Sequence, residues 1–126
     1  MEVIKIAGAE DTPNIILDAE NKIFEISGRS LPEDVVVFYQ PVMDWLDEFG
    51  KNPFNDFELS IKLEYFNTAS SKLILDILLK LEDIFNNGTP LKVKWFFLAS
   101  DNDMKEAGEE YSEIVGLPFE ITEYKV

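Results

Sequence analysis

Residues 57–85 read FELSIKLEYFNTASSKLILDILLKLEDIF, and this stretch decides the fold. From Phe57 to Tyr65, apolar and polar side chains alternate, which predicts a strand with one packed face and one wet face. From about Leu73 to Phe85, apolar side chains surround most of a predicted helix, and we expect that helix to be buried. A doubly wound sheet is covered on both faces and would show continuous apolar strands. The alternation therefore favours a sheet whose helices all pack on one face.

The junction between this strand and helix is the polar segment Tyr65-Phe66-Asn67-Thr68-Ala69-Ser70-Ser71-Lys72. The first N–H groups of a helix lack partners within the helix, and the helix dipole places positive charge there. A phosphate could be bound at Thr68 or added to it covalently, with Lys72 one turn along as its counter-charge. Asn67 or Thr68 could equally be an ordinary helix cap, with Ser70 and Ser71 filling the first turn. The local sequence leaves these interpretations open.

Signals on the N-terminal side of this segment predict a hairpin and a helix. Two short strands over residues 14–18 and 22–27 enclose a turn-forming stretch, which indicates a hairpin. The pattern Ser30-Leu31-Pro32-Glu33 is that of a capping box, so a helix should begin after Ser30 as its cap and end near Gly50. Pro41 lacks an N–H group, and we expect a kink or break there.

On the C-terminal side, we expect a strand over residues 91–98, a helix from about Asp103 and a strand over residues 119–124. Gly108 should let that last helix approach the sheet closely. The order is then β-β-α-β-α-β-α-β, and right-handed crossovers make the later strands parallel. We therefore predict an α/β fold, a two-layer sandwich with a mixed sheet and its helices packed on one face.

Composition excludes several classes of function. The 126 residues contain no linker or repeat, so we expect a single domain over residues 1–126. Without cysteine or histidine, the chain lacks thiolate zinc sites and the usual general base. A net charge of -14 argues against nucleic acid and anionic membranes as partners. The acidic surface could attract a partner with a basic patch, or could simply keep the protein soluble. The absence of a membrane-spanning run and of a signal peptide predicts a cytoplasmic location.

Two further segments carry side chains suited to a site. Asp101 and Asp103 follow a strand and could ligate Mg²⁺ or Ca²⁺, but the spacing is not that of an EF-hand, and both are also ordinary cap residues. Arg29 is the only arginine and could hold a phosphate or the carboxylate of a partner, or could be a simple surface residue. No nucleophile with a base is recognisable, so we assign no catalytic residue.

The chain resembles the SiaC-type regulatory phosphoproteins, small bacterial proteins with a STAS-like fold related to anti-sigma-factor antagonists. The segments that carry the resemblance are Thr12-Pro13 with residues 15–18, residues 26–33, residues 38–41 with Trp45-Leu46, residues 65–72, Trp95 and residues 101–108. The segment around Thr68 is the specific one. The family tends to carry Ser where Ala69 stands and a more acidic run around residues 100–103, and neither difference removes the threonine.

The resemblance implies a phosphorylation switch. A Ser/Thr protein kinase would modify Thr68, a PP2C-type phosphatase would reverse the modification, and the unmodified form would bind and activate a diguanylate cyclase. We therefore expect a non-enzymatic regulator of cyclic-di-GMP signalling without cofactor or metal. Its phosphorylation site is Thr68, and its partner-binding residues are Asn67, Ser70, Ser71, Lys72 and Arg29.

Two alternatives remain. One is a STAS-type sensor that binds a small molecule or anion at the helix start after Thr68, and the other is a metal-assisted enzyme that uses Asp101 and Asp103.

Overall fold

The computed structural model describes residues 2–53 and 57–125. In chain order the elements are β1 (Ile4–Ile6), β2 (Asn14–Asp18), β3 (Ile23–Ser30), α1 (Val35–Lys51), β4 (Phe57–Phe66), α2 (Thr68–Asn86), β5 (Leu91–Leu98), α3 (Asn102–Ile114) and β6 (Phe119–Tyr124).

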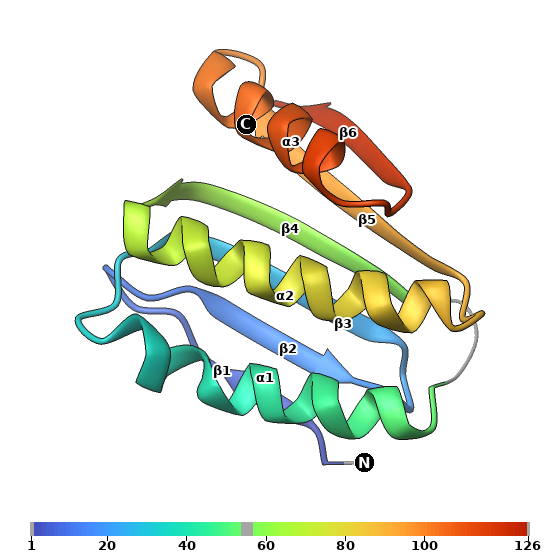
Figure 1. The fold of residues 1–126 in the computed structure, drawn as a ribbon. Coiled ribbons are helices and arrows are strands. Elements are labelled where there is room, and N and C mark those ends of the chain that lie inside the picture. The colour runs from blue at the N-terminus through green and yellow to red at the C-terminus, as the bar shows by residue number, and fades with distance from the viewer. Residues whose placement is uncertain (1, 54–56, 126) are drawn as a thin grey trace.

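The strands form one mixed sheet in the order β1-β2-β3-β4-β5-β6. Strands β1, β2 and β3 pair antiparallel, whereas β3, β4, β5 and β6 pair parallel. The three helices lie on the same side of this sheet (Figure 1). This arrangement confirms the predicted two-layer α/β fold with a mixed sheet and one covered face.

The covered face holds the core. The side chains of Phe57, Leu59, Ile61 and Leu63 alternate along β4 and are each no more than 2% exposed. Helix α2 turns Ile74, Ile77, Leu78 and Leu81 onto them, each again no more than 1% exposed. The intervening side chains of β4, such as Lys62, lie on the uncovered face, where Lys94 pairs with Glu58 at 3.5 Å.

Helix α3 packs closely on β5, which confirms the prediction made from Gly108. A Cβ atom at Gly108 would lie 2.4 Å from Cδ1 of Trp95, so only glycine fits against the indole. Trp95 is fully buried and its Nε1 donates a hydrogen bond of 2.9 Å to the carbonyl oxygen of Met104. Helix α3 therefore holds the ring through close contact at Gly108 and through the hydrogen bond to Met104.

Strand β1 was not predicted. Its three residues pair with β2, where Ile4 lies opposite Leu17 and Ile6 opposite Ile15. Only the short alternation of Ile4 and Ile6 marks this edge strand in the sequence, and its formation depends on pairing with residues nine or more positions away.

The predicted cap of the first helix is wrong. Ser30 is the last residue of β3, paired in register with Phe66 of β4, and the cap of α1 is Asp34. The Asp34 carboxylate accepts a hydrogen bond of 3.1 Å from the Val37 N–H. Parallel pairing with β4 carries the strand through Ser30, so the helix begins one turn later than the local pattern indicates.

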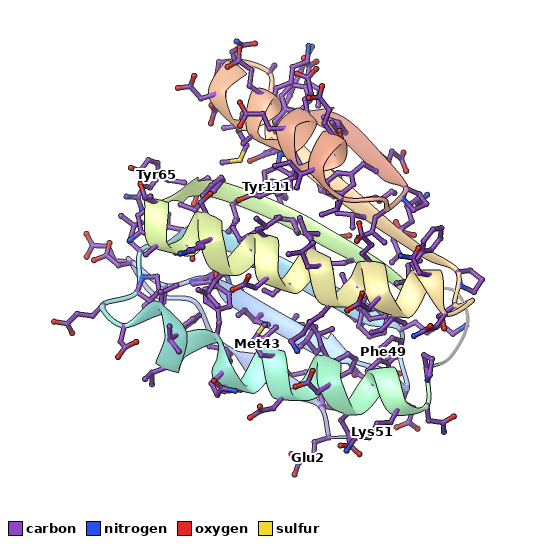
Figure 2. All side chains as sticks on the ribbon, viewed as in Figure 1. Glu2, Met43, Phe49, Lys51, Tyr65 and Tyr111 are labelled. Carbon is purple, nitrogen blue, oxygen red and sulfur yellow. The ribbon has the colours of Figure 1, made fainter. Side chains whose placement is uncertain are left out.

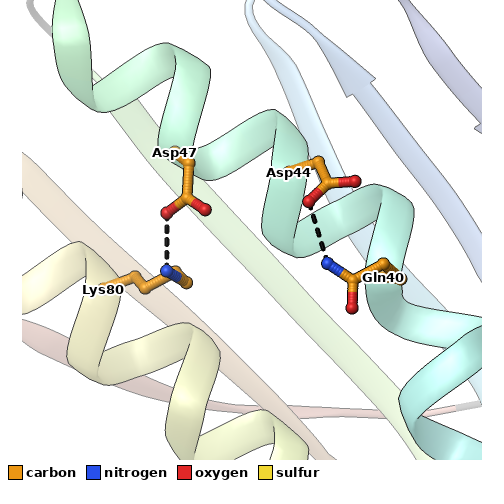
Figure 3. A network of polar contacts seen from close by, with 4 residues as sticks. All are labelled: Gln40, Asp44, Asp47 and Lys80. Carbon is orange, nitrogen blue, oxygen red and sulfur yellow. Dashed lines mark hydrogen bonds and ion pairs between the residues drawn. The ribbon is translucent and has the colours of Figure 1, made fainter.

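The predicted break at Pro41 is also absent, because α1 runs from Val35 to Lys51 without interruption. Pro41 is exposed, so water can hydrogen-bond the Val37 carbonyl that its missing N–H leaves free. Polar contacts line the outer side of the helix: Gln40 Nε2 donates to Asp44 at 2.8 Å, and Lys80 of α2 reaches Asp47 at 2.5 Å (Figure 3).

Among the described residues, no helix has the length and apolar character needed to span a membrane.

Candidate functional site

The start of α2 presents Thr68 at the surface. Asn67 is the helix cap, and its side-chain oxygen accepts a hydrogen bond of 2.8 Å from the Ser70 N–H. The Ser71 N–H donates to the Asn67 carbonyl at 2.9 Å, which closes the first turn. Thr68 is the first helical residue and its side chain is exposed. Of the two residues that the sequence offers as the helix cap, Asn67 is the cap. The Thr68 side chain is not needed for capping and is available for modification or binding.

Beneath Thr68, three buried hydroxyl groups join β3, α1 and α2. Ser30 Oγ donates to Ser70 Oγ at 2.9 Å, and Ser70 Oγ donates to the Ser30 carbonyl at 2.9 Å. Since a hydroxyl has one proton, the contact of 2.6 Å between Tyr39 and Ser30 must have Tyr39 as its donor. Ser30, Ser70 and Tyr39 are all 0% exposed. This closed network fixes the first turn of α2 against the sheet.

A second pair of hydroxyl groups ties the same turn to α3. The Tyr111 hydroxyl donates to the Ser71 carbonyl at 2.8 Å and lies 2.9 Å from Ser71 Oγ, which then donates to it. Figure 2 shows Tyr111 between α3 and α2. Tyr111 therefore sets the distance between the two helices at the end where Thr68 lies.

An open groove of about 470 Å³ lies between α2 and α3 beside this contact. Its walls are two stripes of side chains at helical spacing, with Phe66 between them. The α2 stripe is Thr68, Ser71, Lys72 and Leu75, and the α3 stripe is Ala107, Glu110, Tyr111 and Ile114. Thr68 is thus exposed and lines a largely apolar groove.

The two tyrosines stay protonated at neutral pH. Burial raises the pKa of Tyr39 above its ordinary value of 10.0. Burial likewise raises the pKa of Tyr111, opposed by its hydrogen bond with Ser71. Both hydroxyls therefore act as hydrogen-bond donors that support the helix start.

The structure brings most of the sequence-predicted residues to one end of the molecule. Lys72 is exposed one turn after Thr68 and forms no salt bridge with any of the described residues. Arg29 is exposed at the end of β3, and the following residue, Ser30, accepts a hydrogen bond of 3.1 Å from the Asn67 N–H. Ser70 is fully buried, so its side chain supports the turn from within.

Asp101 and Asp103 lie beside the end of β4. With Glu64 and Tyr65 they line a small hollow, which shares Phe66 and Ala107 with the larger groove. Asp101 caps α3 by accepting a hydrogen bond of 3.0 Å from the Met104 N–H. In residues 2–53 and 57–125, no three acidic side chains gather closely enough to hold a metal ion.

Sequence reasoning missed the roles of three tyrosines. The sequence gives no direct sign of the roles of Tyr39 and Tyr111, although a buried tyrosine hydroxyl needs a partner and the hydroxyl-rich segment after Asn67 could have supplied one. Tyr65 was assigned to the packed face of its strand, which is wrong, because it is 49% exposed. Gly28 of β3 lies opposite Leu63 of β4, but the next residue, Arg29, lies opposite Tyr65, so Glu64 is an extra residue of β4. This bulge interrupts the alternation of β4, and Tyr65 turns outward.

Comparison with known proteins identifies the family. Residues 6–124 match the family described as SiaC family regulatory phosphoprotein. The chain is 31% identical over 121 residues to an uncharacterised protein of Pseudomonas aeruginosa (strain UCBPP-PA14), with 96% of both chains covered.

Solved structures support the same family. The fold is similar to the crystal structure of apo-SiaC from Pseudomonas aeruginosa, with a TM-score of 0.88, 31% identity and coverage of 97% of this chain and 99% of that chain. It is also similar to a chain in the crystal structure of the diguanylate cyclase SiaD in complex with its activator SiaC from the same organism. There the TM-score is 0.90 and the identity 30%, over 96% of this chain and 99% of that chain. The protein described here therefore belongs to the SiaC family of regulatory phosphoproteins.

Proposed function

We propose that this protein is a non-enzymatic cytoplasmic regulator whose binding to a diguanylate cyclase is switched by reversible phosphorylation of Thr68. The observation that carries the proposal is the exposed Thr68 hydroxyl at the first position of α2. Thr68 lines the groove between α2 and α3, and the chain belongs to a family of regulatory phosphoproteins.

The helix start is suited to hold the added phosphate. Phosphorylation adds about 1.5 to 2 negative charges at neutral pH. The N–H groups of Thr68 and Ala69 precede the first backbone hydrogen bond of the helix, which starts at Ser71, so they belong to the donors that a helix start offers to an anion. Lys72, exposed and without a salt bridge to the described residues, lies at the i+4 position and supplies a counter-charge.

The partner in this proposal is a diguanylate cyclase, by analogy with the complex of SiaD with SiaC. Exposed Lys72 and Arg29 and half-buried Asn67 contact the cyclase directly, whereas Ser70 and Ser71 contribute by holding the turn. A dianion on Thr68 releases the cyclase through desolvation and like-charge repulsion, and every 1.4 kcal/mol of such cost weakens binding about tenfold. A Ser/Thr kinase adds the phosphate and a PP2C-type phosphatase removes it.

The phosphorylation site is tested by purifying the protein from its native host in growing and in starved cells and mapping phosphates by mass spectrometry. We expect a single phosphate on Thr68 whose occupancy differs between the two states. Thr68→Ala should carry none, while Thr122→Ala, a threonine on the uncovered sheet face, should keep it.

Regulated phosphate in Thr68→Ala would refute the site. Complete absence of phosphate in both states would instead favour an anion sensor at the same helix start. That alternative predicts that inorganic phosphate raises the melting temperature of the unmodified protein.

A further inference from the structure

Arg29 and Tyr65 form an exposed pair next to the phosphorylation site. They are register partners at the ends of the parallel strands β3 and β4, and the Arg29 guanidinium carbon lies 5.7 Å from the centre of the Tyr65 ring. This is within the range of a cation–π contact. Figure 2 shows Tyr65 at the end of β4 where α2 begins.

A backbone irregularity creates this pair. The register of β3 against β4 shifts between Gly28 and Arg29, and Gly28 has a φ of +98°, a conformation that other residues rarely adopt. Without the shift, the alternation of β4 would turn the Tyr65 ring toward the core, as it turns Leu63. Bulges of this kind re-aim side chains near functional sites. The chain thus exposes a large aromatic ring at a cost in buried area.

The guanidinium is available to a partner. Arg29 forms no salt bridge with any described residue, although the chain carries 25 acidic side chains. It presents five N–H donors in a planar fork, and contact with the Tyr65 ring face leaves them free to bind a carboxylate through two oxygens. Tyrosine and arginine are also the residue types most enriched among the energetically dominant positions of protein interfaces.

We propose that the Arg29–Tyr65 pair is the anchor through which this protein recognises the diguanylate cyclase, by binding a carboxylate of the cyclase that lies beside an apolar side chain. The inference rests on the proposed function and names the chemistry of its interface. Arg29 binds the carboxylate, and the exposed Tyr65 ring packs against the apolar neighbour. Tyr65 also lines a hollow with Glu64, Asp101 and Asp103, whose negative charges repel a carboxylate, so the carboxylate of the cyclase binds at Arg29 and not in that hollow.

This anchor also explains why a phosphate on Thr68 releases the partner. Arg29 precedes Ser30, Thr68 follows Asn67, and Ser30 and Asn67 are joined by a hydrogen bond of 3.1 Å. The phosphate therefore enters the region where the carboxylate of the cyclase binds. It repels that carboxylate and competes with it for the guanidinium.

The test uses the SiaD-like diguanylate cyclase of the same organism and isothermal titration calorimetry with the unphosphorylated, full-length protein. We expect Tyr65→Ala and Arg29→Gln each to weaken binding by about 30-fold, the effect typical of a dominant interface residue. Tyr65→Phe should bind within about threefold of the wild type, since the ring face and not the hydroxyl is used. Thermal melts of each variant verify that it is folded.

The chain offers a matched control. Lys62 Nζ lies 4.3 Å from the centre of the Tyr124 ring on the uncovered sheet face, a second cation–aromatic pair, which shares a hollow with Gly28 and Glu64 but not with Thr68. Lys62→Gln and Tyr124→Ala should leave the affinity unchanged.

Three results would overturn the inference, and they separate it from the proposed function. If Tyr65→Ala and Arg29→Gln bind like the wild type while Thr68→Glu does not, the anchor is wrong and the switch stands. If the control pair weakens binding equally, the contact is not specific to Arg29 and Tyr65. If the wild type does not bind the cyclase at all, both proposals fail.

Discussion

Substitution of Gly108 by alanine tests how firmly α3 is held against the sheet. The new Cβ atom would lie 2.4, 2.7 and 2.8 Å from three atoms of the Trp95 indole, all well inside van der Waals contact. The indole cannot move aside, because it is fully buried and its Nε1 is hydrogen-bonded to Met104. Helix α3 must therefore shift outward. Overpacking of this severity costs about 3 kcal/mol, of which the better helix propensity of alanine returns about 1 kcal/mol.

We therefore expect Gly108→Ala to lower the free energy of unfolding by about 2 kcal/mol, measured by urea denaturation with tryptophan fluorescence. Gly50→Ala in α1 is the matched control, since its Cβ atom would meet only Ile84 at an ordinary 3.4 Å. That variant gains the same helix propensity without the clash and should be slightly more stable than the wild type. If Gly108→Ala is as stable as Gly50→Ala, the packing described for α3 and Trp95 is wrong.

Other predictions concern the helix start. Asn67→Ala removes the cap of α2 and should lower the free energy of unfolding, measured by urea denaturation, by about 1 kcal/mol. Asn67→Asp keeps a capping side chain and should be as stable as the wild type. An unchanged denaturation midpoint for the alanine variant would contradict the capping role. Ser70→Ala breaks both buried hydrogen bonds of the Ser70 hydroxyl and should lower the free energy of unfolding by about 1–3 kcal/mol. Ala69→Gly, at the exposed neighbouring position, should lower it by less, and equal losses in the two variants would argue against the buried network. Because burial raises the pKa of Tyr39, the unfolded chain loses that proton first, so stability should fall as the pH rises above about 10. Tyr39→Phe should weaken this dependence in chemical denaturation at pH 9 to 11, and an identical slope would show that Tyr39 does not contribute to it.

The sequence predicts the features of this fold that depend on long periodic patterns. The alternation from Phe57 onward identifies β4 and the single covered face, because one strand of ten residues samples both faces several times. The polar segment before α2 and the glycine in α3 were likewise informative, since each residue type there has a specific physical use. These local signals agree with the tertiary structure.

The positions of Ser30 and Tyr65, which the sequence did not predict, both depend on contacts between distant segments. Ser30 has the local pattern of a helix cap, but pairing of β3 with β4 and the hydroxyls of Tyr39 and Ser70 hold it in the strand. Tyr65 continues the alternation of its strand in the sequence, yet the extra residue Glu64 at the register shift between β3 and β4 turns it outward. No property of the residues near Ser30 or Tyr65 alone reveals these partners.

The central claim is that the phosphorylation state of Thr68 controls binding of the diguanylate cyclase. The most direct test is isothermal titration of the SiaD-like cyclase of the same organism with the unmodified protein and with protein phosphorylated only at Thr68. We predict that the phosphate weakens binding at least tenfold, that phosphatase treatment restores it, and that Thr68→Ala binds like the unmodified protein. Equal affinity of the two forms for the cyclase would contradict the account.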